Sequence, residues 1–218
     1  MGIVSFSGID GSGKGTQIKI IEIFLNAHNR KFKTVWARGS WTPGIELVKR
    51  IVRKDKGFNE EQKAGYRKEA RSNPKTSKII LILSILDMTW YFGIWYRILK
   101  LFYKELICDR YIWDTLVDFK VNFSSFDFEK WFIWKFLVWI TPKPDISILL
   151  VISAEMSLTR GIEKNEEHME KIEIKRKKVD EYQKLITLNY WNCMIKADDS
   201  SDNISQKIIQ ELYNHKIL

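Results

Sequence analysis

The stretch Phe6-Ser7-Gly8-Ile9-Asp10-Gly11-Ser12-Gly13-Lys14-Gly15-Thr16-Gln17 decides the fold of this chain. It follows an apolar run, Gly2 to Phe6, and opens a helical pattern of apolar residues that continues to Leu25. The glycines allow the backbone to curl with its N–H groups pointing inward, and Lys14 can place its ammonium among phosphate oxygens at a helix N-terminus. This order of strand, loop and helix predicts a phosphate-binding loop, whose nucleotide-holding residues are Gly8, Gly11, Ser12, Gly13, Lys14, Gly15 and Thr16.

The composition is consistent with one globular α/β domain that binds anions. The chain has 218 residues, 45% of them hydrophobic, which is enough for a five- or six-stranded core. The net charge is +9, with 36 Lys and Arg against 27 Asp and Glu. Nucleotides satisfy such a charge as well as nucleic acid does, and the basic residues form neither a compact patch nor a nucleic-acid module. We therefore expect no nucleic-acid partner.

Two predicted strands end in charged residues that extend the candidate site. The run Phe32 to Arg38 ends in Arg38, and the run Leu106 to Tyr111 contains Asp109 and Arg110. Ligands of open parallel sheets bind at the carboxyl ends of the strands, so Arg38 is a candidate for the phosphate of a second substrate. Asp109 is a candidate for the waters of a magnesium ion, and Arg110 for a transferring phosphoryl group. The alternatives are a solvated Arg38 and an Asp-Arg ion pair without a catalytic part.

Several segments further along the chain leave their roles open. Asp114 and Asp118 either add acidity to the site or face solvent. The charges from Glu166 to Lys184 are predicted to form mostly a solvated helix face. Arg160 and Lys164 flank Gly161, a possible hinge at which a lid over about 154–170 would close on a nucleotide.

Two apolar, aromatic segments are expected to serve the core or a dimer interface. The segment from Ile79 to Tyr103 carries Asp87 in its middle, so a membrane-spanning helix would place a carboxylate near mid-bilayer. The segment from Phe126 to Ile140 is too short and too charged to span. Membrane contact is therefore not expected. Since no secretory signal precedes the first strand, the expected location is the cytoplasm.

With these motifs, the chain resembles the thymidylate kinase family of P-loop nucleoside monophosphate kinases over nearly its whole length. The matching motifs are the loop from Phe6 to Lys14, Arg38, Asp109-Arg110-Tyr111, Pro144-Asp145, Leu158 to Arg160 and Ile195-Lys196-Ala197-Asp198. The resemblance implies a single P-loop NTPase domain over 1–218, a three-layer α/β/α fold with a five-stranded parallel sheet, helices on both faces and a small helical lid. It also implies ATP and Mg²⁺ as cofactors, phosphoryl transfer to a nucleoside monophosphate, foremost from ATP to dTMP, and a homodimer.

The resemblance further implies roles for individual residues. Lys14 would hold the transferring phosphoryl group, Asp10 would approach the acceptor's sugar, and Arg110 would bridge both phosphates. Arg160 or Lys164 would close from the lid, and Thr16 and Asp109 would hold the metal through water. The implied acceptor-binding residues are Asp10, Arg38, Asp87, Arg110 and Tyr111.

Three departures from the family pattern concern the metal and the acceptor. Gly15 follows the lysine where the family usually has Ser or Thr, and Thr16 comes next. Leu83 and Asp87 stand where the family commonly pairs Phe with Arg in the thymine pocket. Gly39-Ser40-Trp41 follows Arg38 in place of Glu-Pro-Gly. Two alternatives stay open: a different phosphorylated acceptor, and a nucleotide-binding module without turnover.

Overall fold

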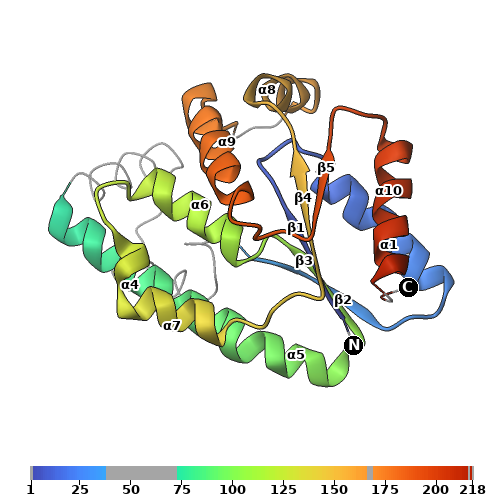
Figure 1. The fold of residues 1–218 in the computed structure, drawn as a ribbon, viewed down its shortest axis with the longest axis horizontal. Helices are drawn as coiled ribbons and strands as arrows, with labels where there is room; N and C mark the ends of the chain where they lie inside the picture. Colours follow the sequence, from blue (N-terminus) through green and yellow to red (C-terminus); the bar gives the residue numbers. More distant parts are fainter. Residues whose placement is uncertain (1, 38–72, 166–168, 216, 218) are drawn as a thin grey trace, which may run out of the picture. The chain divides into compact units, whose positions relative to one another are not determined.

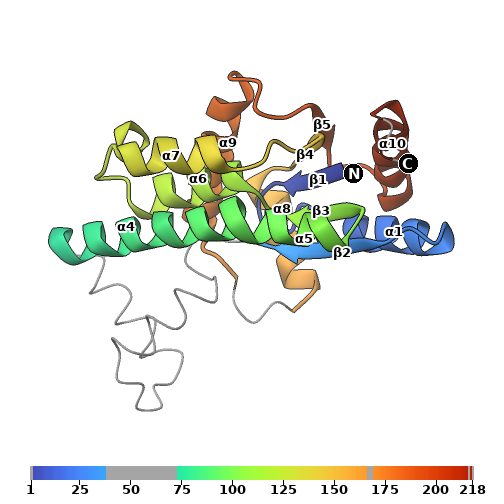
Figure 2. The same ribbon diagram turned by 90° about the horizontal axis from the view of Figure 1, so that it is seen from below.

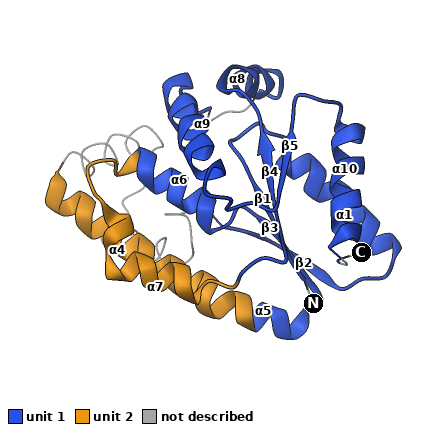
Figure 3. Cartoon of the chain, in the orientation of Figure 1, with its two compact units in different colours: residues 1–37, 98–121, 143–218 blue, residues 38–97, 122–142 orange. Residues whose placement is uncertain are grey.

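The computed structural model describes residues 2–37, 73–165, 169–215 and 217 (Figure 1). The chain divides into two compact units (Figure 3). Unit 1 comprises residues 1–37, 98–121 and 143–218, and unit 2 comprises residues 38–97 and 122–142. That the whole chain acts as one kinase domain stays a prediction.

Unit 1 is built on a five-stranded, all-parallel sheet with the strand order β2-β3-β1-β4-β5. The predicted parallel sheet is confirmed. The central strand β1 is buried along its whole length because β3 and β4 flank it on either side. The strands are β1 (Gly2–Ser7), β2 (Phe32–Trp36), β3 (Glu105–Asp109), β4 (Ile146–Val151) and β5 (Cys193–Lys196).

Helices of unit 1 cover both faces of this sheet. In Figure 1, α1 (Lys14–Ala27) and α10 (Ser201–Asn214) lie on one side, and α6 (Ile112–Asn122) and α9 (Ile172–Ile186) on the other. Right-handed crossovers explain this division, because the chain moves in one direction from β1 to β2 and in the opposite direction from β3 to β4 and β5. The three-layer architecture is therefore also confirmed.

The strand register places two predicted motifs beside each other. Phe6 of β1 is level with Asp109 of β3, so the loop after β1 and the turn after β3 leave the same edge of the sheet. Ser7 is level with Leu149 of β4, which precedes α8 (Ala154–Glu163). The carboxyl ends of β1, β3 and β4 thus converge on one site.

Unit 2 contains one long helical run and a short aromatic helix. The run consists of α4 (Pro74–Trp90), a π-helical turn η1 (Tyr91–Trp95) and α5 (Tyr96–Phe102), of which the last residues belong to unit 1 (Figure 2). Asn73 caps α4 by accepting from the backbone N–H of Lys75 at 3.0 Å. The π turn brings Gly93 against α7 (Phe132–Ile140), where a Cβ would lie 3.0 Å from Cδ1 of Ile140.

The run Pro74–Phe102 is the one helix, within the described ranges, that is long and apolar enough to cross a membrane. Length and composition are weak criteria, because core helices of soluble proteins meet them as well. Leu81, Ile85, Met88 and Phe92 are fully buried, at i, i+4, i+7 and i+11. One face of the helix is therefore core, which agrees with the first of the two predicted roles.

The aromatic segment from Phe126 to Ile140 is not one continuous helix. A short 3₁₀ turn η2 (Phe128–Lys130) comes first, and Trp131 adopts an extended conformation before α7 begins. Phe128 and Trp134 are buried against each other with their ring centroids 5.1 Å apart, while Phe132 points to solvent. The sequence alone gives no turn residue that would mark this break.

Candidate active site

The loop between β1 and α1 has the backbone that its glycines predict. Gly8 has φ 138° and Gly11 has φ 80°, values that side chains rarely allow. A Cβ on Gly8 would lie 2.6 Å from the carbonyl oxygen of Leu150, and one on Gly11 would lie 2.9 Å from that of Ser157. The loop therefore has no room for side chains at either position.

Lys14 begins α1 and folds back over this loop. Its ammonium donates to the carbonyl oxygens of Gly8 at 2.8 Å and Ile9 at 2.9 Å, and the residue is 6% exposed. Burial and the neighbouring Arg110 lower the pKa of Lys14 to about 8, although nearby carboxylates raise it. The cation is thus held by neutral carbonyl groups, which an anion can replace.

Arg110 directly follows β3 and lies beside the loop. It is 3% exposed, its guanidinium forms an ion pair with Asp10, and Nη1 donates to the carbonyl oxygen of Gly8 at 3.2 Å. Its φ is 75°, a left-handed conformation that is strained for arginine. Burial alone would lower the pKa of Arg110, but Asp10 and other acidic groups raise it well above its ordinary value.

Asp109 offers an oxygen that suits a magnesium ion. Its Oδ1 is buried and has no hydrogen-bond partner among the described residues. Burial raises the pKa of Asp109, whereas Lys14 and Arg110 lower it. A bare carboxylate oxygen beside a phosphate loop fits a hard cation and its waters. Thr16, the other predicted metal residue, is exposed on the first turn of α1 next to Gly15.

Asp114 organises the site, and its role was missed at the sequence level. The side chain is 1% exposed, so the alternative that it faces solvent is wrong. Its carboxylate accepts from Ser7 Oγ at 2.6 Å and from the backbone N–H of Gly8 at 3.1 Å and of Tyr111 at 2.9 Å. A signal was present, since Asp114 stands four residues after Arg110 at the start of a helix.

Helix α9 supplies buried polar groups that the predicted solvated face did not include. Tyr182 donates its hydroxyl to Asp114 at 2.5 Å, and Lys178 pairs with Asp118 at 2.7 Å. Lys175 is 1% exposed and donates to Ser157 Oγ at 2.7 Å. The prediction of a solvated face is therefore wrong at these positions. Of the two alternatives for Asp118, the solvent-facing one is excluded because the residue is buried.

Of the two basic residues predicted for the lid, Arg160 contacts the phosphate loop and Lys164 lies at the exposed end of α8. Arg160 of α8 donates to the carbonyl oxygen of Ala197 at 2.7 Å and to that of Gly11 at 3.4 Å, so it reaches the loop. Lys164 caps the C-terminus of α8 and is exposed. Gly161 lies buried inside α8, which runs through it without a break. The hinge at Gly161 and the lid over about 154–170 stay predictions.

Of the predicted acceptor residues, Asp10, Arg110 and Tyr111 lie together in unit 1. Tyr111 is buried and held through its backbone by Asp114, close to Arg110. Arg38 lies outside the described residues. Asp87 is partly buried on α4 and belongs to unit 2, whereas the cluster described above belongs to unit 1.

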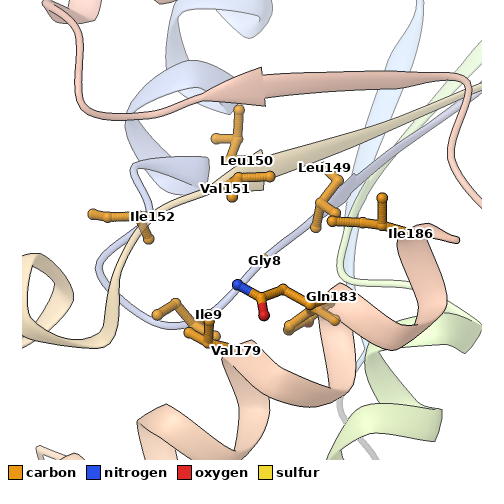
Figure 4. A pocket seen from close by; sticks show the side chains of 10 residues that line it. Gly8, Ile9, Leu149, Leu150, Val151, Ile152, Val179, Gln183 and Ile186 are labelled. Carbon is orange, nitrogen blue, oxygen red and sulfur yellow. The ribbon is translucent and has the colours of Figure 1, made fainter.

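A small apolar pocket lies behind the loop. Figure 4 shows residues of β4 on one side and of α9 on the other, with Gly8 and Ile9 between them. The pocket is lined by Gly8, Ile9, Leu149, Leu150, Val151, Ile152, Val179, Tyr182, Gln183 and Ile186. Its lining is almost entirely carbon, so it is a gap between sheet and helix and not the anion site.

The parallel sheet, the glycine-rich loop and the convergence of Lys14, Asp109 and Arg110 define a P-loop protein of the α/β NTPase class. The sequence model of the thymidylate kinase family matches residues 99–208. The chain belongs to the thymidylate kinase family, a family of nucleoside monophosphate kinases. It is also 25% identical over 213 residues to a protein named probable thymidylate kinase from Methanocaldococcus jannaschii, an alignment that covers 97% of this chain and 95% of that protein.

The loop glycines give a first prediction. Gly11→Ala should lower the free energy of unfolding by about 2 kcal/mol, because alanine is strained at positive φ and its Cβ meets Ser157. Gly15→Ala is the matched control: its Cβ meets nothing within 4 Å, and alanine in a helix gains about 0.5–1 kcal/mol over glycine. Urea unfolding of both variants measures the difference. Equal effects would contradict the described loop.

The position of Lys14 gives a second prediction. A ¹³C NMR titration should show a lysine with a midpoint at about pH 8, and Lys14→Met should remove that signal. Between pH 8 and its unfolded value near 10.5 the unfolded chain binds more protons at this lysine, so the stability of the wild type relative to Lys14→Met should rise with pH. Below pH 8 this group contributes no pH dependence. A midpoint near 10.5 would mean that the ammonium is solvated.

Proposed function

We propose that the protein transfers the γ-phosphoryl group of ATP to a nucleoside monophosphate, foremost dTMP, to give ADP and dTDP. The observation that carries the proposal is the meeting of Lys14, Arg110 and Asp10 at the carboxyl edge of the sheet. Family membership and the name of the Methanocaldococcus protein support the same reaction.

The residues of the loop align and neutralise the donor. Backbone N–H groups of the loop and of the first turn of α1 would bind the phosphates of ATP, and Lys14 would exchange the carbonyls of Gly8 and Ile9 for phosphate oxygens. Asp109 and Thr16 would hold Mg²⁺ through water, and the ion would supply charge neutralisation between the phosphates. Such transfer depends on alignment and electrostatics more than on covalent chemistry.

The remaining residues serve the acceptor and the transferring group. Arg110 would leave Asp10 to bridge the two phosphates, and Asp10 would then turn to the acceptor's sugar. Arg160 reaches Gly11 and would add positive charge over the loop. Lys164, Arg38, Tyr111 and Asp87 complete the proposed set, the last three on the acceptor side.

The proposal also covers location and assembly. We propose a cytoplasmic location from the family, and a homodimer because α7 exposes an apolar stripe at i, i+4 and i+7 that a second copy would bury. Phe132 and Trp139 in this stripe are 79% and 77% exposed, and Phe136 lies between them with its ring centroid 5.7 Å from that of Trp139.

The third prediction concerns the reaction. ADP release with ATP and Mg²⁺, measured for dTMP, dUMP, UMP, CMP, AMP and GMP, should be fastest with dTMP. Arg110→Ala should lower kcat about 100- to 1,000-fold, because it removes a cation from the transition state. Lys130→Ala, which breaks a solvent-exposed ion pair with Asp127, is the control and should leave kcat unchanged.

Two other outcomes would favour the alternatives. Turnover with another monophosphate and not with dTMP would show a different acceptor. ATP binding without turnover of any acceptor would refute the kinase and leave a nucleotide-binding module.

The fourth prediction concerns the stripe on α7. Sedimentation velocity should give a dimer for the wild type and a monomer for Phe132→Glu with Trp139→Glu, because buried carboxylates oppose association. Lys135→Glu, at an exposed position on the same helix, reverses a charge without removing an apolar side chain and is the control. A monomeric wild type at micromolar concentration would refute the dimer.

A further inference from the structure

The carboxylate of Asp114 contacts three segments of unit 1: the phosphate loop, the turn that carries Arg110, and α9. Oδ2 accepts from Ser7 Oγ, at the end of β1, and from the N–H of Tyr111, after β3. Oδ1 accepts from the N–H of Gly8, where the phosphate loop begins, and from the hydroxyl of Tyr182 on α9. Nη1 of Arg110 lies 3.7 Å from the same oxygen. One buried charge therefore contacts the donor loop, the arginine turn and α9.

Only a carboxylate can serve both backbone groups at once. It has two acceptor oxygens and no donor, whereas an amide of the same shape has one oxygen and one NH₂. The hydroxyls of Ser7 and Tyr182 can rotate to face an NH₂ group. The N–H groups of Gly8 and Tyr111 cannot, so an amide leaves one of them without an acceptor in either orientation.

A second buried contact joins the same two helices. Asp118 lies one turn further along α6 and pairs with Lys178, one turn earlier on α9. Both partners are almost fully buried, and Lys178 also pairs with Glu170 at 2.7 Å. Both contacts bury a carboxylate of α6 against α9, but Asp118 pairs with a cation and Asp114 with a neutral hydroxyl. Asp114 is in addition bonded to the phosphate loop.

We propose that Asp114 is the positioning residue of the transfer site, and that Tyr182 orients it from α9. The carboxylate sets where the loop begins relative to Arg110, and so sets the distance between the donor phosphates and the group that bridges them. It also keeps a negative charge beside Arg110 when that side chain exchanges Asp10 for phosphate. The inference rests on the proposed kinase reaction and adds residues that touch neither substrate.

The fifth prediction compares Asp114→Asn with Asp118→Asn in the dTMP kinase assay. Asp114→Asn should lower kcat per folded molecule about 100-fold, the loss expected for a displacement of about 1 Å between reacting groups. The KM for ATP should change far less, because Lys14 and the other loop N–H groups remain. Both variants should lower the urea midpoint of unfolding by similar amounts, but Asp118→Asn should leave kcat nearly unchanged. Amide hydrogen exchange should accelerate at Gly8 or Tyr111 in Asp114→Asn alone.

Tyr182→Phe tests the second half of the proposal. It removes one donor from Oδ1 and leaves Gly8 bonded, so kcat should fall less, by about 10-fold. In the double variant with Asp114→Asn, kcat should be no lower than in Asp114→Asn alone, because both changes act through one carboxylate.

The outcomes separate this proposal from the kinase assignment. A wild type that transfers phosphate to no monophosphate refutes the proposed function. A wild type that does so, with Asp114→Asn as active per folded molecule as Asp118→Asn, overturns the positioning role alone. Additive losses of kcat for Asp114→Asn and Tyr182→Phe would overturn the part given to Tyr182.

Discussion

Burial of two cations side by side is the constraint on which the rest of the site depends. Lys14 and Arg110 are both almost fully buried, and each lowers the stability of the other's charge. The fold compensates with three carboxylates, Asp10, Asp109 and Asp114, from the loop, the end of β3 and the start of α6. The parallel register of β1 and β3 is what brings these acids and bases to one edge.

Helix α9 connects the charged groups of the site to the rest of unit 1 through buried polar contacts. Three of its buried polar side chains, Lys175, Lys178 and Tyr182, lie at i, i+3 and i+7. Each is hydrogen-bonded or ion-paired to a different residue of unit 1. Tyr182 bonds Asp114, Lys178 bonds Asp118, and Lys175 bonds Ser157, which in turn donates to the carbonyl oxygen of Asp10. Because buried polar groups are costly unless paired, these contacts favour one placement of α9 against the loop.

Local pattern was enough to predict the loop, since an apolar run, glycine spacing and a following helix are all short-range features. The five-stranded parallel sheet was predicted from the family resemblance that these motifs support. It was not enough for Asp114, because an acid on an amphipathic helix can face solvent or core. Its partner Tyr182 is 68 residues away in the sequence. Lys175 was misjudged for the same reason, since its partner Ser157 lies on α8. Side chains whose role depends on a distant partner are beyond local periodicity.

The described state suggests how the proposed substrates would enter. Lys14 is bonded to neutral carbonyls, so an incoming phosphate replaces weak partners with a full charge. Arg110 already has a carboxylate, so it gains little by exchanging Asp10 for phosphate. That exchange releases Asp10, whose oxygens are then available to a sugar hydroxyl. The loop would therefore bind the phosphates of ATP strongly. On the acceptor side, the free energies of the Arg110–Asp10 pair and of an Arg110–phosphate pair would be nearly equal. Asp114 stays beside Arg110, so the guanidinium would keep a buried carboxylate next to it when it leaves Asp10.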